Sequence, residues 1–173
     1  MSLKVKVGDP LPSVGLRATD GYLLNLRSFV TKQPALLVFF GAPTMAAGAG
    51  RRRGLKTMEA LVAGHERLRE AGIAIAAIST DSEQQQAAFV ARHELPFLLL
   101  SDERRSAVNV LGVETVADGA NVNVARPMAL AVDVDGAIRA ILDPIDPETL
   151  VDQAMRSLSE PIPGATTGPA ASG

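Results

Sequence analysis

Two uninterrupted apolar runs constrain the fold of this chain more than any other feature of its sequence. They are Ala35–Phe40 and Ile73–Ile78. Apolar runs of this length, without alternating polar residues, are typical of strands that helices cover on both faces. Between the runs, apolar side chains recur at helical spacing from about Arg51 to Gly72, which predicts the longest helix of the chain. We therefore expect a strand, a helix and a second strand at the centre of a sheet.

The flanking segments complete a mixed α/β domain. Leu16–Leu26 is expected to form a hairpin, because Asp20–Gly21 is a strong two-residue turn signal. A second hairpin is expected where Met128–Val132 and Ala137–Leu142 flank a turn. The other expected elements are a helix from Ser79–Ser82 to about His93, a short strand over Leu95–Leu100, a short helix over Asp102–Val110, a loop over Glu114–Arg126, and a last helix that starts at Asp146–Pro147.

This succession of elements predicts a thioredoxin-like α/β fold. Its parts are a mixed central sheet, helices on both faces of that sheet and an N-terminal β-hairpin. We expect one domain over residues 1–159. Pro, Gly, Ala and Thr dominate residues 160–173, which favours a disordered tail.

The overall composition excludes several classes of function. Lys and Arg number 17 against 19 Asp and Glu, so a formal net charge of -2 recruits neither nucleic acid nor an anionic membrane. The lack of Trp removes the stacking platform of a single-strand binder. No apolar run approaches the roughly 20 residues that cross a bilayer, and the first residues lack the apolar core of a secretory signal. We expect a cytoplasmic protein without nucleic-acid or membrane partners.

The absence of cysteine is the strongest chemical constraint, since it removes disulfides, thiolate ligands, thiol nucleophiles and redox cycling together. The two histidines, His65 and His93, have no neighbour at metal-ligand spacing, so no metal site is expected. Asp102–Glu103, Asp133 and Asp135 fall in expected turns, where carboxylates accept backbone hydrogen bonds, and we assign them structural roles. No nucleotide-binding motif is present, and no cofactor is expected.

Several segments resemble the peroxiredoxin family, also called the alkyl hydroperoxide reductase and thiol-specific antioxidant family, and in particular its monomeric bacterioferritin-comigratory branch. Leu95–Asp102 is similar to the family segment L-x-F-P-L-L-S-D, and Arg126–Arg139 is close to R-x-T-F-x-I-D-x-x-G-x-I-R. Their order and spacing match the family over about residues 7 to 158, which implies an antioxidant oxidoreductase of thioredoxin fold. The other matching segments are Val7–Pro12, Thr19–Gly21, Ser79–Ser82 and Leu111–Val113.

The departure from the family pattern falls at the catalytic loop. The family carries P-x-x-x-T-x-x-C after the central strand, where this chain has Pro43, Thr44 and Met45 followed by Ala and Gly. Aligning Thr44 on the motif threonine puts Ala47 at the peroxidatic position, whereas aligning the strand end puts Gly48 there. Against a thioredoxin W-C-x-x-C loop, Met45 and Gly48 take the two cysteine positions. No alignment places a cysteine in the loop, so the thiol peroxidase reaction is expected to be absent.

The resemblance also assigns a role to Arg126, which matches the family arginine that stabilises the thiolate and orients the peroxide. Peroxide reduction needs a thiolate that attacks the O–O bond, and neither Ala nor Gly offers a lone pair. Met45 can be oxidised, but its thioether is not activated by a lowered pKa and its sulfoxide needs a separate reductase. Arg126 therefore either tunes a remaining pocket or forms a structural salt bridge.

A candidate anion site lies where the loop enters the long helix. Three adjacent arginines fall there at the positive end of the helix dipole, which is unfavourable for cations. An anion bound by the arginines and by the backbone N–H groups would offset this repulsion. The alternative is a solvated arginine run, offset by acidic residues on later turns. The residues concerned are Gly48, Gly50, Arg51, Arg52, Arg53 and Arg126.

Three hypotheses for function follow. The first, which the sequence favours, is a cysteine-less relative of a redox enzyme that serves as a binding or regulatory module. The second is an enzyme or anion-binding protein that uses the former active-site pocket through Thr44, Arg51 and Arg126, although threonine without an adjacent base is a poor nucleophile. The third is a protein–protein module, for which a homodimer would be the commonest form.

Overall fold

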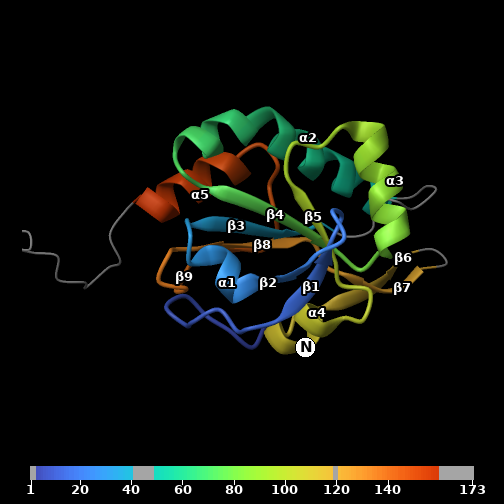
Figure 1. Ribbon diagram of the computed structural model, residues 1–173, viewed down its shortest axis with the longest axis horizontal. Helices are drawn as coiled ribbons and strands as arrows, with labels where there is room; N and C mark the ends of the chain where they lie inside the picture. Colours follow the sequence, from blue (N-terminus) through green and yellow to red (C-terminus); the bar gives the residue numbers. More distant parts are fainter. Residues whose placement is uncertain (1–2, 41–48, 119–120, 160–173) are drawn as a thin grey trace, which may run out of the picture.

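A mixed sheet of seven strands, in the order β2-β1-β5-β4-β3-β8-β9, organises the chain (Figure 1). The computed structural model describes residues 3–40, 49–118 and 121–159, with side chains for all of these except 49–53, 116–118 and 121–124. The strands are β1 Gly15–Ala18, β2 Leu23–Asn25, β3 Ala35–Phe39, β4 Ala74–Ser79, β5 Leu98–Ser101, β6 Thr115–Asp118, β7 Asn121–Ala125, β8 Met128–Val132 and β9 Ile138–Leu142, and the helices are α1 Leu26–Val30, α2 Ala49–Glu70, α3 Glu83–His93, α4 Ser106–Leu111 and α5 Leu150–Ser159.

The two apolar runs form the centre of the sheet, as their composition predicts. Strand β3 is buried at all five positions and pairs in parallel with β4, which in turn pairs in parallel with β5. Strand β8 joins β3 from the other side in antiparallel orientation. Because no residue of β3 faces water, the continuous apolar sequence is explained by its central place.

Helices cover both faces of the sheet (Figure 1). On one face, side chains of α2, α3 and α5 pack with Leu36 and Val38 of β3. On the other face, side chains of α1 and α4 pack with Leu37 and Phe39. Alternate residues of β3 thus point into two separate cores, which is the arrangement expected of a thioredoxin-like sheet.

Local signals at the helix ends agree with the sequence. Helix α2 ends before Gly72, which has a φ of 77°, and the N–H of Ile73 donates to the carbonyl of Leu68 in a Schellman arrangement. Ser82 is the N-cap of helix α3: its hydroxyl accepts the N–H of Gln85, while the Gln85 side chain accepts the N–H of Ser82. None of the helices within the described ranges is both long and apolar enough to cross a membrane.

The expectation of a loop over 114–126 is wrong. The chain forms the hairpin β6–β7 there, a two-stranded sheet apart from the main one. The signals were present as the turn dipeptide Asp118–Gly119 and the alternation of Val122 and Val124 with asparagine. The alternation covers only Asn121–Val124, a run too short to distinguish a strand from a loop by periodicity alone.

Three further boundaries differ from the sequence expectations. Helix α1 was not expected, and it begins because the Asn25 side chain accepts the N–H groups of Arg27 and Ser28. The short helix expected from Asp102 begins later, at Ser106, after a turn. The last helix is preceded by a turn at Asp146, and its regular part starts at Leu150.

Candidate functional site

Most of the predicted site residues lie outside the part of the chain whose side chains are described. Pro43, Thr44, Met45, Ala47 and Gly48 lie outside the described residues. The backbone of α2 includes Gly50, Arg51, Arg52 and Arg53, but their side chains lie outside the described part. The candidate anion site therefore remains a prediction, and Arg126 is the member whose surroundings are described.

Arg126 lies at the end of the sheet from which the former catalytic loop leaves. Met128, the first residue of β8, pairs with Phe39, the last residue of β3. Arg126 stands two residues before Met128, in the link between β7 and β8. Arg126 therefore lies near the carboxyl end of β3.

The guanidinium of Arg126 is held by two carboxylates. Its Nη1 lies 3.0 Å from Glu114 Oε1, and its Nη2 lies 3.0 Å from Asp143 Oδ1. The N–H of Arg126 also donates to the Glu114 carbonyl at 2.7 Å, which closes the base of the β6–β7 hairpin. The side chains of Arg126, Glu114 and Asp143 are 41%, 44% and 30% exposed, so solvent weakens both ion pairs. The structure contains the salt bridge that the sequence analysis gave as one alternative.

A buried polar cluster joins the carboxyl ends of β4 and β5 to α3. Gln86, which is fully buried, donates from Nε2 to Ser79 Oγ at 2.8 Å and to the Leu100 carbonyl at 2.7 Å. Ser79 Oγ in turn donates to Asp81 Oδ2 at 2.8 Å, and Ser101 Oγ donates to the Asp81 carbonyl at 2.6 Å. The cluster fixes the pairing of the two strands with the helix that connects them. The sequence predicts only a helix start at Ser79–Ser82, and Gln86 is not among the predicted site residues, although it stands one turn before Phe89 on the buried side of α3.

Asp102 has the structural role that the sequence predicts. Its carboxylate accepts the N–H groups of Ala107 at 3.0 Å and Val108 at 2.9 Å, and so caps the start of α4. The residue is 1% exposed, and this burial raises the pKa of its carboxyl above the ordinary value, against the opposing effect of the backbone hydrogen bonds.

Asp133 is structural as well, since its Oδ1 accepts the N–H groups of Asp135 and Ala137 in the turn between β8 and β9.

The two histidines lie on separate helices, as predicted. The His65 ring lies 6.4 Å from the Phe97 ring, and the His93 ring lies 4.3 Å from the Phe89 ring, measured between centroids. Both rings therefore lie beside a phenylalanine ring.

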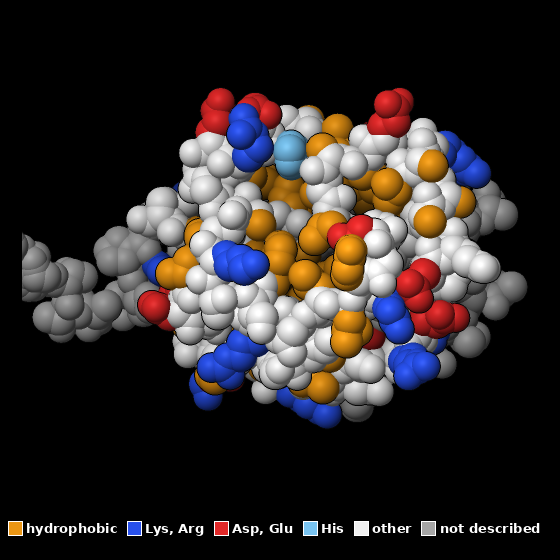
Figure 2. Space-filling model, viewed as in Figure 1, with side chains coloured by type: hydrophobic (Ala, Val, Ile, Leu, Met, Phe, Trp, Pro, Cys, Tyr) orange, Lys and Arg blue, Asp and Glu red, His pale blue; other side chains and the backbone are white. Residues whose placement is uncertain are grey.

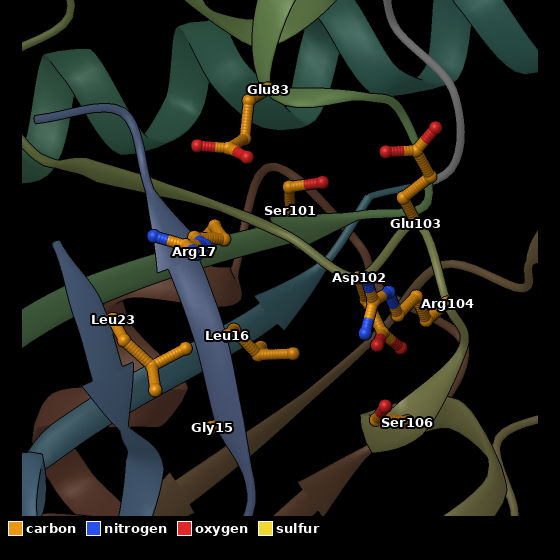
Figure 3. Close-up of a pocket in the computed structure, with 10 residues that line it drawn as sticks. All are labelled: Gly15, Leu16, Arg17, Leu23, Glu83, Ser101, Asp102, Glu103, Arg104 and Ser106. Carbon is orange, nitrogen blue, oxygen red and sulfur yellow. The ribbon is translucent and has the colours of Figure 1, made fainter. Parts of the chain in front are cut away.

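A cleft of about 440 Å³ opens beside β1, where sequence analysis had no candidate (Figure 3). It is lined by parts of β1 and β2, the first residue of α3, the end of β5 and the turn into α4. On the face shown in Figure 2, hydrophobic side chains gather near the middle, with acidic and basic side chains to their right. No local sequence pattern predicts this cleft, because its walls come from segments that are distant in the sequence. Its residues are Gly15, Leu16, Arg17, Leu23, Glu83, Ser101, Asp102, Glu103, Arg104 and Ser106.

Comparison with known proteins identifies relatives. Residues 7–141 match the AhpC/TSA family. Peroxiredoxin Bcp of Escherichia coli K12 is 29% identical over 143 residues, which cover 80% of this chain and 86% of that protein. The chloroplastic peroxiredoxin Q of Populus jackii is 33% identical over 100 residues, which cover 58% of this chain and 44% of that protein.

Solved structures show the same fold. Peroxidoxin BcpB from Mycobacterium tuberculosis superposes with a TM-score of 0.75 at 21% identity, over 89% of this chain and 96% of that one. A cysteine-to-serine mutant of PrxQ from Xylella fastidiosa superposes with a TM-score of 0.73 at 15% identity, over 89% and 95% of the two chains. The thioredoxin-like fold predicted from the sequence is thereby confirmed.

Proposed function

Because this chain belongs to the AhpC/TSA family of peroxiredoxins and yet contains no cysteine, we propose that it is a binding or regulatory module without thiol peroxidase activity. The observation that carries the proposal is the absence of cysteine from all 173 residues. The thiolate that attacks the peroxide is also the group that is oxidised and then reduced again, so its loss removes the whole cycle.

The surroundings of Arg126 support the same proposal. An arginine whose guanidinium faces a reactive anion must keep hydrogen-bond donors free for it. Here Glu114 accepts a hydrogen bond from one terminal nitrogen and Asp143 forms an ion pair with the other, so the three side chains together carry a net negative charge. Arg126 thus links the base of the β6–β7 hairpin to the residue that follows β9, which is a structural task.

The test is a peroxide consumption assay on the purified protein. Hydrogen peroxide is followed with dithiothreitol or thioredoxin as the reductant, and Escherichia coli Bcp serves as the comparison protein. We expect the rate with this protein to equal the rate of the reductant alone. A saturable rate that rises in proportion to the protein concentration would contradict the proposal.

The alternative, an enzyme or anion-binding protein that uses Thr44, Arg51 and Arg126, has weaker support because Arg126 is already paired with two carboxylates. Its test is the melting temperature in millimolar phosphate, sulfate or nucleotide, compared between the natural chain and a triple alanine variant at positions 51 to 53. A rise that the triple variant loses would favour an anion site. No rise, or an equal rise in both proteins, would remove it.

Regulation through self-association is a separate proposal that sedimentation can test. A homodimer would give a sedimentation coefficient that rises with concentration in the micromolar range. A single monomeric species throughout that range would weaken the idea of a dimeric module without affecting the peroxidase prediction.

A further inference from the structure

The cleft beside β1 exists because β1 continues past the end of its neighbour. Strand β5 ends at Ser101, which pairs with Arg17. The two preceding residues of β1, Gly15 and Leu16, have no partner on that side, because the chain turns away at Asp102 toward α4. On this side of β1, Gly15 and Leu16 therefore have no neighbouring strand, and the antiparallel pairing stops at Arg17.

The backbone of Gly15 faces this open place. Along an antiparallel strand, the hydrogen-bonding groups of successive residues point alternately to the two sides. Val14 and Ala18 bond toward β2, since the Val14 carbonyl accepts from Leu26 and the Ala18 N–H donates to Tyr22. The alternation therefore directs the N–H and C=O of Gly15 away from β2 and into the cleft. One donor and one acceptor of the main chain are thus available there to an extended peptide.

Five charged residues line the cleft, and one of them, Asp102, already accepts the N–H groups of Ala107 and Val108. Figure 3 shows the carboxylates of Glu83 and Glu103 on one side, with Arg17 and Arg104 on other sides. With the described residues, the side chains of Glu83, Glu103 and Arg104 form no hydrogen bond or ion pair. Arg17 makes one long hydrogen bond, 3.5 Å to the Gly21 carbonyl. Among the described residues, the side chains of Glu83, Glu103 and Arg104 therefore have no partner, and the Arg17 guanidinium is held only by this long contact, so these groups can bind a ligand.

The remaining wall is apolar and the floor is polar. Leu16 is buried, while Leu23 is 68% exposed and borders the same cleft. Ser101, which is 7% exposed, donates its hydroxyl hydrogen to the Asp81 carbonyl, so its oxygen can act only as an acceptor. A ligand for this cleft would combine an apolar side chain, backbone donors and charges of both signs.

We propose that this cleft binds a short extended peptide that carries both a free ammonium and a free carboxylate group. Glu83 and Glu103 would accept hydrogen bonds from the ammonium, and the arginines would donate to the carboxylate. The main chain of Gly15 would pair with a central residue of the peptide, whose apolar side chain would cover Leu23. The volume of about 440 Å³ suits a ligand of this size. The inference does not depend on the former catalytic loop, so its failure would leave the peroxidase proposal intact.

Calorimetric titration with the tripeptide Ala-Leu-Ala tests the proposal. The peptide is used in its free form, with an acetylated N-terminus, and with an amidated C-terminus. We expect saturable binding of the free form and a loss of about tenfold in affinity for each blocked form, since each block removes one charge-assisted contact. An absence of saturable binding at millimolar peptide would overturn the proposal, as would equal affinity for all three forms.

Variants assign each terminus to its side chains. In a Glu83→Gln, Glu103→Gln double variant, the free and acetylated peptides should bind equally, while amidation should still weaken binding. In an Arg17→Gln, Arg104→Gln double variant, the free and amidated peptides should bind equally, while acetylation should still weaken binding. A Glu59→Gln, Arg92→Gln double variant removes exposed charges outside the cleft and should behave as the natural chain. Circular dichroism checks that each variant is folded. An equal loss in the control variant would show that the loss of binding does not come from the charges of the cleft, and would overturn the proposal.

Discussion

The Val151 side chain of α5 lies directly against the backbone of Gly64 in α2. A Cβ atom built on Gly64 would stand 2.5 Å from Val151 Cγ2 and 3.0 Å from Cγ1. Both atoms belong to one branched side chain with a single side-chain torsion, which has little freedom to move aside. The two helices can approach this closely because residue 64 has no side chain.

Replacement of Gly64 by alanine should therefore destabilise the protein. Alanine favours a helix over glycine by about 1 kcal/mol, but the overlap with Val151 should outweigh this gain and leave a net loss of about 1–3 kcal/mol. Urea unfolding measures the loss. Adding Val151→Ala to Gly64→Ala should recover part of it, because the two residues are in contact. Equal or greater stability of the single variant would show that the helices separate without cost.

Gln86 should be intolerant of both an apolar and an acidic substitution. Gln86→Leu removes the donor to the Leu100 carbonyl and to Ser79, and should cost about 1–3 kcal/mol of unfolding free energy. Gln86→Glu should cost more, and increasingly so as the pH rises, because a carboxylate would face the Leu100 carbonyl. Unfolding of both variants at several pH values checks this. A Gln84→Glu variant, at an exposed position on the same helix, is the control.

Asp102 should make the protein less stable as the pH rises through the acid range. Its folded-state pKa is raised by burial, so the folded protein holds the proton more tightly than the unfolded chain. The contribution is fully present below the ordinary pKa of 3.8 and is lost as the pH passes the folded pKa. Asp102→Asn should remove this dependence.

The measurement is the difference in unfolding free energy between the natural chain and Asp102→Asn from pH 3.5 to 6.5. We expect the stability of the natural chain relative to the variant to decrease with rising pH. Using the difference cancels other groups such as Glu66, whose pKa is lowered by the hydrogen bond from Arg69. A relative stability that increases with pH would contradict the raised pKa.

Cysteine introduced at the former peroxidatic position tests the family alignment. Ala47→Cys and Gly48→Cys each add one thiol at a position that the alignment proposes. If the scaffold retains part of the site, one of these thiols should be oxidised by peroxide faster than a thiol at exposed Ala91 on α3. Mass spectrometry after timed exposure to peroxide gives the rates. Equal rates at all three positions would mean that the scaffold no longer activates a thiol.

Release of Arg126 should then raise the reactivity of the introduced thiol. Asp143→Asn removes one of the two carboxylates that the guanidinium contacts, and so leaves more positive charge for a thiolate. In the faster cysteine variant, Asp143→Asn should increase the oxidation rate several-fold, whereas Arg126→Gln should decrease it. An unchanged rate in both would show that Arg126 does not face the thiol.

Part of the fold was predictable because its signals are local. The runs Ala35–Phe40 and Ile73–Ile78 predict buried central strands, and the structure confirms both. The turn dipeptide Asp20–Gly21 likewise predicts the first hairpin. The hairpin β6–β7 carries a similar Asp-Gly signal at 118–119 but forms a two-stranded sheet apart from the main one, so the pattern of the central sheet does not predict it. The cap at Asn25 was missed because the helix that it starts has only five residues.

The sequence by itself determined the fold class, the family resemblance and the absence of a thiol, since each follows from residue types and their order along the chain. Only the tertiary structure decided that Arg126 pairs with Glu114 and Asp143, and that an open place adjoins Gly15. The physical reason is that these contacts join residues far apart in the chain. They depend on strand register and on where β5 ends, which no local pattern of residues specifies.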